Sequence, residues 1–294
     1  VWRAGQDAVR LVSDDLLIVT PDATLRSNLE LTLPMDGSSP ELDLRTGVSG
    51  FDLAAVQRYL PANKMSPTVV EWLDAALRGG RVSNVDVTFV GPVLAFPFDG
   101  GEGEFHATAN VEGGDLAFIR DWPRAEDLVG SVEFVNTRFA AQGSGRVLGN
   151  RSADLRVGIA DLRTGEVTVQ ANTLGSLDQL LAFVNAAPLI ATYLGKDFER
   201  LEAPSGTGAV SFNLLLPLRD RESYELTAGL GIVDGEIAFR GFEPHATEIQ
   251  GSLALAGGVV SGEGIQGIFL DGPVTASVDA AGVPGYRTRI DLVG

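Results

Sequence analysis

The 294-residue chain contains 39 acidic and 22 basic residues and carries a formal net charge of −17 at neutral pH. Such a charge repels phosphate backbones, so nucleic acid is not an expected partner. The sequence lacks cysteine, which excludes disulfides, zinc–thiolate sites and thiol nucleophiles, whereas its 45% hydrophobic content is ample for a folded core.

Helical signals first occur between residues 52 and 80, after an amino-terminal stretch, residues 1–50, that we expect to form strands. Asp52 is suited to cap a short helix that ends at Pro61. Ser66-Pro67 is typical of an N-cap followed by proline in the first turn, and Gly79-Gly80 is the expected end of this second helix. The two segments predict a helical hairpin. The residues expected to fill the space between the hairpin and a sheet are Trp72, Leu73 and Leu77.

Most of the remaining sequence alternates between apolar and polar residues, which is the period of a half-buried strand. Short segments, Glu112-Gly113-Gly114 and Val233-Asp234-Gly235, are predicted to be turns between consecutive strands, and such short turns favour a mostly antiparallel sheet. A third helix is predicted over residues 176–194, where leucines recur at intervals of three and four and Pro188 marks a kink or a break.

One part of the chain is repeated at an offset of 121 residues. Residues 114–159 match residues 235–280 without a gap, so that Gly114 aligns with Gly235 and Phe118 with Phe239. We expect both copies to contain the same strands in the same order. Reactive side chains do not recur with the repeat, which favours a duplicated surface over a duplicated catalytic site.

The predicted strands present more apolar surface than the few predicted helices can cover. Two arrangements remain open at this point. The sheet either folds onto itself as a sandwich or closed barrel, or it curls and leaves a long apolar trough that a ligand must fill.

Several motifs occur along the chain in a distinctive order: Tyr59-Leu60-Pro61, Met65-Ser66-Pro67, Trp72-Leu73-Asp74, Ala76-Leu77, Gly79-Gly80, Phe96-Pro97-Phe98 and Trp122-Pro123. Together they resemble the motifs of the YhdP family, within the wider group of AsmA-like bacterial envelope proteins. The similarity extends from the region of Phe51 to Gly294, and residues 1–50 are less distinctive.

This resemblance implies a large protein with an inner-membrane anchor and a periplasmic β-groove that reaches toward the outer membrane and carries phospholipid. The sequence shows no signal peptide and no apolar run of about 18 residues. We therefore expect a middle, periplasmic segment that meets the inner and outer membranes only through other parts of a full-length protein.

The expected fold is mainly β: a long, twisted, mostly antiparallel sheet curled into a groove, with a helical hairpin and one further helix. The groove is expected to be continuous, with amino-terminal strands in residues 1–50, the hairpin and the first β repeat in residues 51–175, and a helix and the second β repeat in residues 176–294.

The expected ligands are phospholipid acyl chains, because an apolar wall removes CH₂ groups from water at about 0.8 kcal/mol each. The candidate lipid-binding residues are Phe89, Phe105, Leu116, Phe118, Val132, Phe134, Leu155, Val157, Phe212, Leu214, Leu226, Leu230, Ile237, Phe239, Leu253, Leu255 and Val278. The alternative for each of them is ordinary core packing. The alternative function is a non-catalytic β-rich scaffold or adhesion module with a closed sandwich core.

Neither an enzyme nor a cofactor or metal site is predicted. His106 and His245 do not correspond within the repeat and lie outside HxxxH and HExxH spacings. Asp99, Glu102 and Glu104 lack the ligand order of an EF-hand, and a solvated turn explains them more simply.

Overall fold

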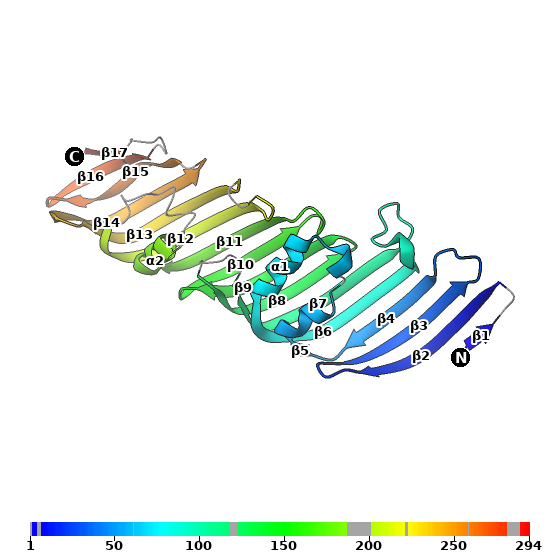
Figure 1. Cartoon of the computed structure of the whole chain (residues 1–294). Helices are drawn as coiled ribbons and strands as arrows, with labels where there is room; N and C mark the ends of the chain where they lie inside the picture. The colour runs from blue at the N-terminus through cyan, green and yellow to red at the C-terminus, as the bar shows by residue number, and fades with distance from the viewer. Residues whose placement is uncertain are drawn as a thin grey trace. The chain divides into compact units, whose positions relative to one another are not determined.

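The computed structural model describes residues 2–4, 7–60, 62–117, 123–186, 201–220, 223–257, 259–280 and 289–294. In these ranges the chain is mainly β, and its seventeen strands belong to one sheet (Figure 1). A sandwich needs two sheets, and the described strands are not divided between two. The chain comprises two compact units, unit 1 (Val1–Leu116, Asp127–Gly143 and Val157–Glu166) and unit 2 (Ala117–Glu126, Ser144–Arg156 and Val167–Gly294).

Unit 1 is built on an antiparallel ladder in which β1 pairs with β2, β2 with β3, β3 with β4, β4 and β5 with β6, and β6 with β7. The strands are β1 (Trp2–Ala4), β2 (Ala8–Val19), β3 (Thr24–Pro34), β4 (Glu41–Val48), β5 (Phe51–Asp52), β6 (Leu77–Pro92) and β7 (Glu104–Leu116). Between β5 and β6 lie the 3₁₀ helices η1 (Leu53–Arg58) and η2 (Ala62–Lys64) and the α-helix α1 (Pro67–Ala76), and η3 (Val93–Ala95) follows β6.

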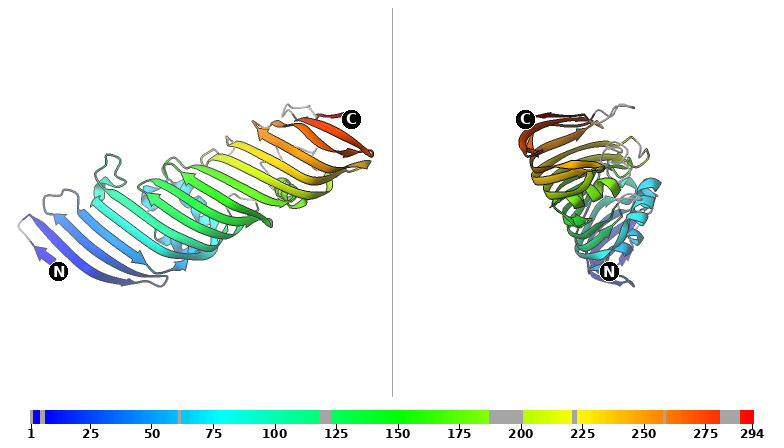
Figure 2. Two further views of the ribbon diagram at one scale, coloured as in Figure 1. Left: turned by 180° about the vertical axis from the view of Figure 1, so that it is seen from behind. Right: turned by 90° about the vertical axis from the view of Figure 1, so that its left-hand side faces the viewer.

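Unit 2 contains a second antiparallel ladder, in which six strands pair in chain order from β12 to β17 (Figure 2). These strands are β12 (Leu201–Pro217), β13 (Glu225–Phe239), β14 (Phe242–Ala256), β15 (Val259–Phe269), β16 (Gly272–Ala280) and β17 (Arg289–Val293). The helix α2 (Leu177–Ala186) precedes β12. Four further strands, β8 (Ala125–Val135), β9 (Arg138–Val147), β10 (Asn150–Ile159) and β11 (Glu166–Ser176), contribute residues to both units.

The sequence repeat is confirmed at the level of its strands. Strand ends in the two copies fall at equivalent positions, 121 residues apart. This holds for the last residues of β8 and β14, the first residues of β9 and β15, and the last residues of β10 and β16. The backbone repeats too: Asp127 and Glu248, which are equivalent in the repeat, both have φ of 51°. The two copies therefore have the same strand order.

The predicted turns at residues 112–114 and 233–235 are wrong, because both segments lie inside strands. β7 and β13 continue through them with a shift in register, from Arg81↔Glu112 to Gly79↔Asp115 in the first copy. Gly113 and Asp234 take the positive φ values, 58° and 53°, at these shifts. A β-bulge inserts one extra residue into a strand and lets it continue, so the glycine signal here marks a bulge.

Two of the helical predictions are confirmed at their starts. Asp52 caps η1 by accepting a hydrogen bond from Ala54 N at 2.8 Å, and Ser66 caps α1 by accepting one from Val69 N at 3.2 Å. The predicted end of α1 at Gly79-Gly80 is wrong, because Leu77 already pairs with Leu116 in the ladder. The predicted third helix is α2 up to Ala186, and residues 187–194 lie outside the described residues.

Among the described residues, no helix has the length and apolar character needed to cross a membrane.

Candidate functional site

The ladder of unit 1 has one apolar and one polar face. Residues that face each other across an antiparallel pair lie on the same side of the sheet, and the row Leu29, Leu44, Phe89, Phe105 runs across β3, β4, β6 and β7. The adjacent row, on the opposite face, is Asn28, Arg45, Thr88 and His106. We call the apolar side the first wall; its members are Leu11, Leu29, Leu31, Leu33, Leu42, Leu44, Val87, Phe89, Phe105 and Ala107.

The first wall is open on β2 and β3. Leu11 and Leu33 are 38% and 41% exposed, although both lie on the apolar side of their strands. Ile18, on the same side of β2, is 41% exposed. Large aliphatic side chains on a sheet face are normally covered by another layer, so this part of the wall is a candidate surface for an apolar ligand.

On β6 and β7 the same face is covered by η1. Leu53 of η1 packs with Val82 and Ala109 in a cluster that also contacts Val85.

Two polar residues, Ser27 and Thr46, are buried on the apolar side, and their hydroxyl groups form a hydrogen bond of 2.9 Å. This bond satisfies two polar groups that would otherwise be costly to bury.

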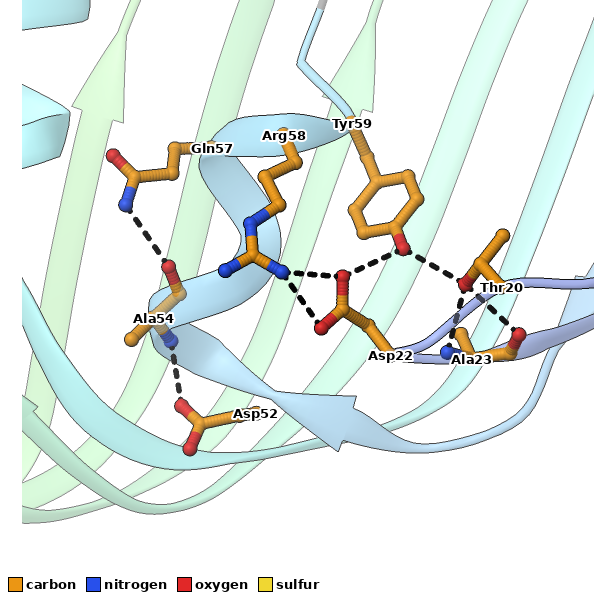
Figure 3. Close-up of polar contacts among 8 residues, drawn as sticks. All are labelled: Thr20, Asp22, Ala23, Asp52, Ala54, Gln57, Arg58 and Tyr59. Atoms are coloured by element: carbon orange, nitrogen blue, oxygen red, sulfur yellow. Dashed lines mark hydrogen bonds and ion pairs between the residues drawn. The ribbon is translucent and has the colours of Figure 1, made fainter.

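A polar cluster fixes η1 to the turn between β2 and β3 (Figure 3). Arg58 Nη1 donates to both carboxylate oxygens of Asp22, at 2.8 and 2.7 Å, and the Tyr59 hydroxyl donates to Asp22 at 3.0 Å. The Tyr59 hydroxyl also lies 3.0 Å from Thr20 Oγ1. The hydrogen bond from Arg58 lowers the pKa of Asp22, and the bond from Tyr59 adds to the effect.

Unit 2 shows the same division of faces. The row Phe212, Ala228, Leu255, Val260 crosses β12 to β15 on one side. The neighbouring row on the other side is Ser211, Gly229, Ala254, Ser261, Asp279 and Arg289. We call the apolar side the second wall; its members are Val210, Phe212, Leu214, Leu226, Ala228, Leu230, Leu253, Leu255, Val260 and Val278.

The helix α2 covers one part of the second wall (Figure 1). Leu177 and Leu180 form a buried cluster with Ile232, Ile249 and Ile265, and several wall residues pack against it. Close approach of the helix depends on glycine at position 208, because a Cβ there would contact Leu180 Cδ1 and lie 3.0 Å from Leu177 Cδ2. The part of the wall covered by α2 is therefore core. Beyond it Leu214, Leu226, Leu255 and Val260 are also buried, and the half-buried Phe212 and Ala228 mark the candidate binding surface.

The predicted lipid-binding residues fall into three groups. Leu214, Leu226 and Leu255 are buried members of the second wall. Five half-buried residues pack against hydrophobic clusters, Leu230, Ile237, Leu253 and Val278 in unit 2 and Val132 in unit 1. The other half-buried residues are Phe89, Phe105, Leu116, Phe134, Leu155, Val157, Phe212 and Phe239. Phe118 lies outside the described residues, as does Trp122.

Sequence reasoning missed the part of the wall contributed by residues 1–50. Leu25, Leu29, Leu31 and Leu33 lie on one side of β3, and their spacing is the same period of two that predicted the later strands. The signal was present in the sequence. Sequence reasoning also missed Phe96 and Phe98, whose rings lie over Phe89 and Phe105.

The prediction that Trp72, Leu73 and Leu77 fill the space between the hairpin and the sheet is partly corrected. Val69 and Ala76 are the fully buried residues of α1, and Trp72, Leu73 and Leu77 are half-buried. Helical residues seven apart share a face, so the side of α1 centred on Val69 and Ala76 forms its core contact.

Both histidines lie beside glutamates of neighbouring strands. His106 Nε2 lies 3.0 Å from Glu133 Oε1, and His245 Nε2 lies 3.6 Å from Glu236 Oε1. The described residues contain no group of three or more His, Cys, Asp or Glu side chains placed to hold a metal ion. Asp99, one of the acids considered for calcium, forms a bidentate pair with Arg163 at 2.8 and 3.1 Å.

These features define an antiparallel β protein whose sheet is apolar on one face and polar on the other in each unit. The chain belongs to the YhdP family, because the sequence profile of the family described as YhdP protein matches residues 1–294. It is 23% identical over 260 residues to the intermembrane phospholipid transporter YhdP of Escherichia coli (strain K12), covering 87% of this chain and 20% of that protein. The chain thus spans a fifth of the length of this relative. No solved structure matches it.

Proposed function

We propose that the chain is a segment of a bridge-like lipid transfer protein and that its two walls hold phospholipid acyl chains in a groove. The observation that carries this proposal is the separation of faces in both ladders, with rows of Leu, Val and Phe on one side of each ladder. An acyl chain lying on such a wall loses contact with water at about 0.8 kcal/mol per CH₂ group. The backbone polar groups of the wall are already paired with one another in the ladder. An acyl chain on the wall therefore does not have to cover unpaired backbone donors or acceptors.

The relative from Escherichia coli, an intermembrane phospholipid transporter, supports phospholipid as the ligand. In the proposed setting the chain lies in the periplasm. A tether to the inner membrane and contacts with the outer membrane belong to other parts of the full-length protein. The polar face keeps such a sheet hydrated, and the net charge of −17 repels other copies of the chain. The segment acts by binding and guiding lipid, without chemical conversion.

Mass spectrometry of organic extracts tests this function. The chain is purified without detergent, and one half of the sample is unfolded in urea and gel-filtered before extraction as a control for carry-over. We expect phospholipid near one molecule or more per folded chain and only traces in the control. Traces in both samples would favour the scaffold or adhesion function over the lipid carrier.

A further inference from the structure

The loop between β6 and β7, residues 93–103, covers the first wall with two phenylalanine rings, and we call it the aromatic loop. The ring of Phe96 lies 5.8 Å from that of Phe89 and 5.6 Å from that of Phe105. Phe98 lies 5.2 Å from Phe89 and is only 3% exposed. Since Phe89 and Phe105 are paired members of the wall, the loop occupies the surface on which an acyl chain would lie.

Glycines allow the loop to fold back this closely. A Cβ on Gly103 would contact the carbonyl oxygen of Val90 and lie 2.6 Å from the Phe98 ring. Gly91 has φ of 133°, and a Cβ there would lie 2.8 Å from Gly103 Cα. The sequence is therefore built to place the rings against the wall.

The aromatic loop is held by ionic contacts that are open to solvent. Arg163 donates to both carboxylate oxygens of Asp99, and it also donates to Asp161 at 2.7 Å. The side chains of Arg163 and Asp99 are 44% and 62% exposed. A bidentate pair within a charge network is the kind of exposed ion pair that contributes to stability, and it is screened by salt, so this contact fastens the loop at the end that carries Asp99 and can still open.

The covering of β6 leaves a narrow part of the first wall uncovered. The cluster around Leu53 reaches Val85 from one end of the strand, and the aromatic loop reaches Phe89 from the other. Four residues of strand, about 13 Å, separate these positions, and Val87 and Ala107 form the pair between them. By contrast, Leu11 and Leu33 on β2 and β3 are well exposed. An acyl chain that moves along the wall therefore meets its narrowest point at β6 and β7.

We propose that Phe96 occupies an acyl-chain position on β6 and β7 and that the aromatic loop moves aside when a lipid tail passes, with the Asp99–Arg163 pair setting how readily it opens. This inference rests on the proposed lipid-carrying function. A ring and an acyl chain are both apolar, so exchanging one for the other keeps the wall covered and avoids exposing it to water. Phe98, being buried, anchors the loop, whereas Phe96 is half-buried and is the ring that yields.

A comparison of proteins with a tethered and an untethered loop tests the proposal. The chain has no cysteine, so Asp99→Cys and Arg163→Cys introduce the only two thiols, which a short bismaleimide joins to tether the loop. A photoreactive benzoylphenylalanine replaces Phe105 under the loop, and in a second protein it replaces Phe212 in unit 2. Each protein is incubated with vesicles of phosphatidylethanolamine and phosphatidylglycerol, irradiated and analysed for lipid adducts. The same proteins treated with N-ethylmaleimide, which blocks the thiols without joining them, are the controls.

We expect the tether to abolish the lipid adduct at position 105 and to leave the adduct at position 212 unchanged. Arg163→Gln, which unfastens the loop without a tether, is expected to raise the adduct at position 105. Arg156→Gln, which removes an exposed pair with Asp154 on β10, is the matched control and is expected to change neither. Equal adducts at position 105 with and without the tether would overturn the gating role and leave the carrier function intact. Failure to form adducts at either position in any protein would overturn the carrier function itself.

Discussion

Adding one negative charge at three positions of unit 1 distinguishes an open wall from a closed core. Leu33 lies on the open part of the first wall and is 41% exposed, whereas Val82 lies under η1 and is 3% exposed. Asn28 lies on the polar face of the same strand as Leu33. The variants Leu33→Asp, Val82→Asp and Asn28→Asp therefore carry the same new charge into three environments.

The expected losses of stability follow from these exposures. Complete burial of a leucine contributes roughly 1.5–3 kcal/mol, and Leu33 is a little over half buried, so Leu33→Asp should cost about 1–2 kcal/mol. Val82→Asp places an unpaired carboxylate in the core and should cost about 3–5 kcal/mol, a large part of a typical stability of about 5–15 kcal/mol. Asn28→Asp should be nearly neutral.

Urea unfolding gives the three free energies, and mass spectrometry of organic extracts gives the bound lipid. We expect Leu33→Asp to be folded but depleted of lipid, because a hydrated carboxylate now stands in the acyl-chain path, and Asn28→Asp to bind lipid like the unmodified protein. A folded Leu33→Asp variant with its full lipid content would refute the assignment of this face as the wall. Equal destabilisation by Leu33→Asp and Val82→Asp would show that the wall is closed.

Three further predictions concern the elements that cover the walls. Ser66→Ala removes the N-cap of α1 and should cost about 1 kcal/mol in thermal or urea unfolding, and Ser66→Thr should restore most of it. Gly208→Ala should destabilise unit 2 by about 1–3 kcal/mol through overpacking against α2, whereas Gly231→Ala, whose Cβ meets only a carbonyl oxygen at 3.9 Å, should not; equal effects would argue against tight docking of the helix. Because Arg58 lowers the pKa of Asp22 in the folded state, this pair stabilises the fold above the ordinary carboxyl pKa of about 3.9 and ceases to do so as the pH falls through the lowered pKa. The melting temperature of Asp22→Asn should accordingly lie below that of the unmodified protein at pH 7 and approach it in acid, and a constant difference across this range would contradict the role of the pair.

The walls could be predicted from sequence because one face of a strand is set by a local period of two. Phe212, Leu214 and Leu226 were recognised in this way, and the register places them on one side of the sheet. The start of α1 at Ser66 was equally local, since the cap and the proline adjoin the helix.

The remaining features depend on contacts between distant residues. The end of α1 is set by the pairing of Leu77 with Leu116, which overrides the glycines that follow. The position of Phe96 over the wall depends on a close approach of Gly91 to Gly103, and a Phe-Pro-Phe sequence alone does not reveal which way its rings turn. The bulge at Gly113 and a turn have the same glycine signal, and only the register distinguishes them.

The assignment of the second wall to lipid is tested most directly by photo-cross-linking at two adjacent positions of β12. Phe212 lies on the second wall and Ser211 on the opposite, polar face, so a benzoylphenylalanine at each position samples one face of the same strand. After purification without detergent and irradiation, we predict a phospholipid adduct, attached through its acyl chain, at position 212 and none at position 211. Adducts of equal yield at both positions, or none at position 212 in a protein that retains its lipid, would contradict the account.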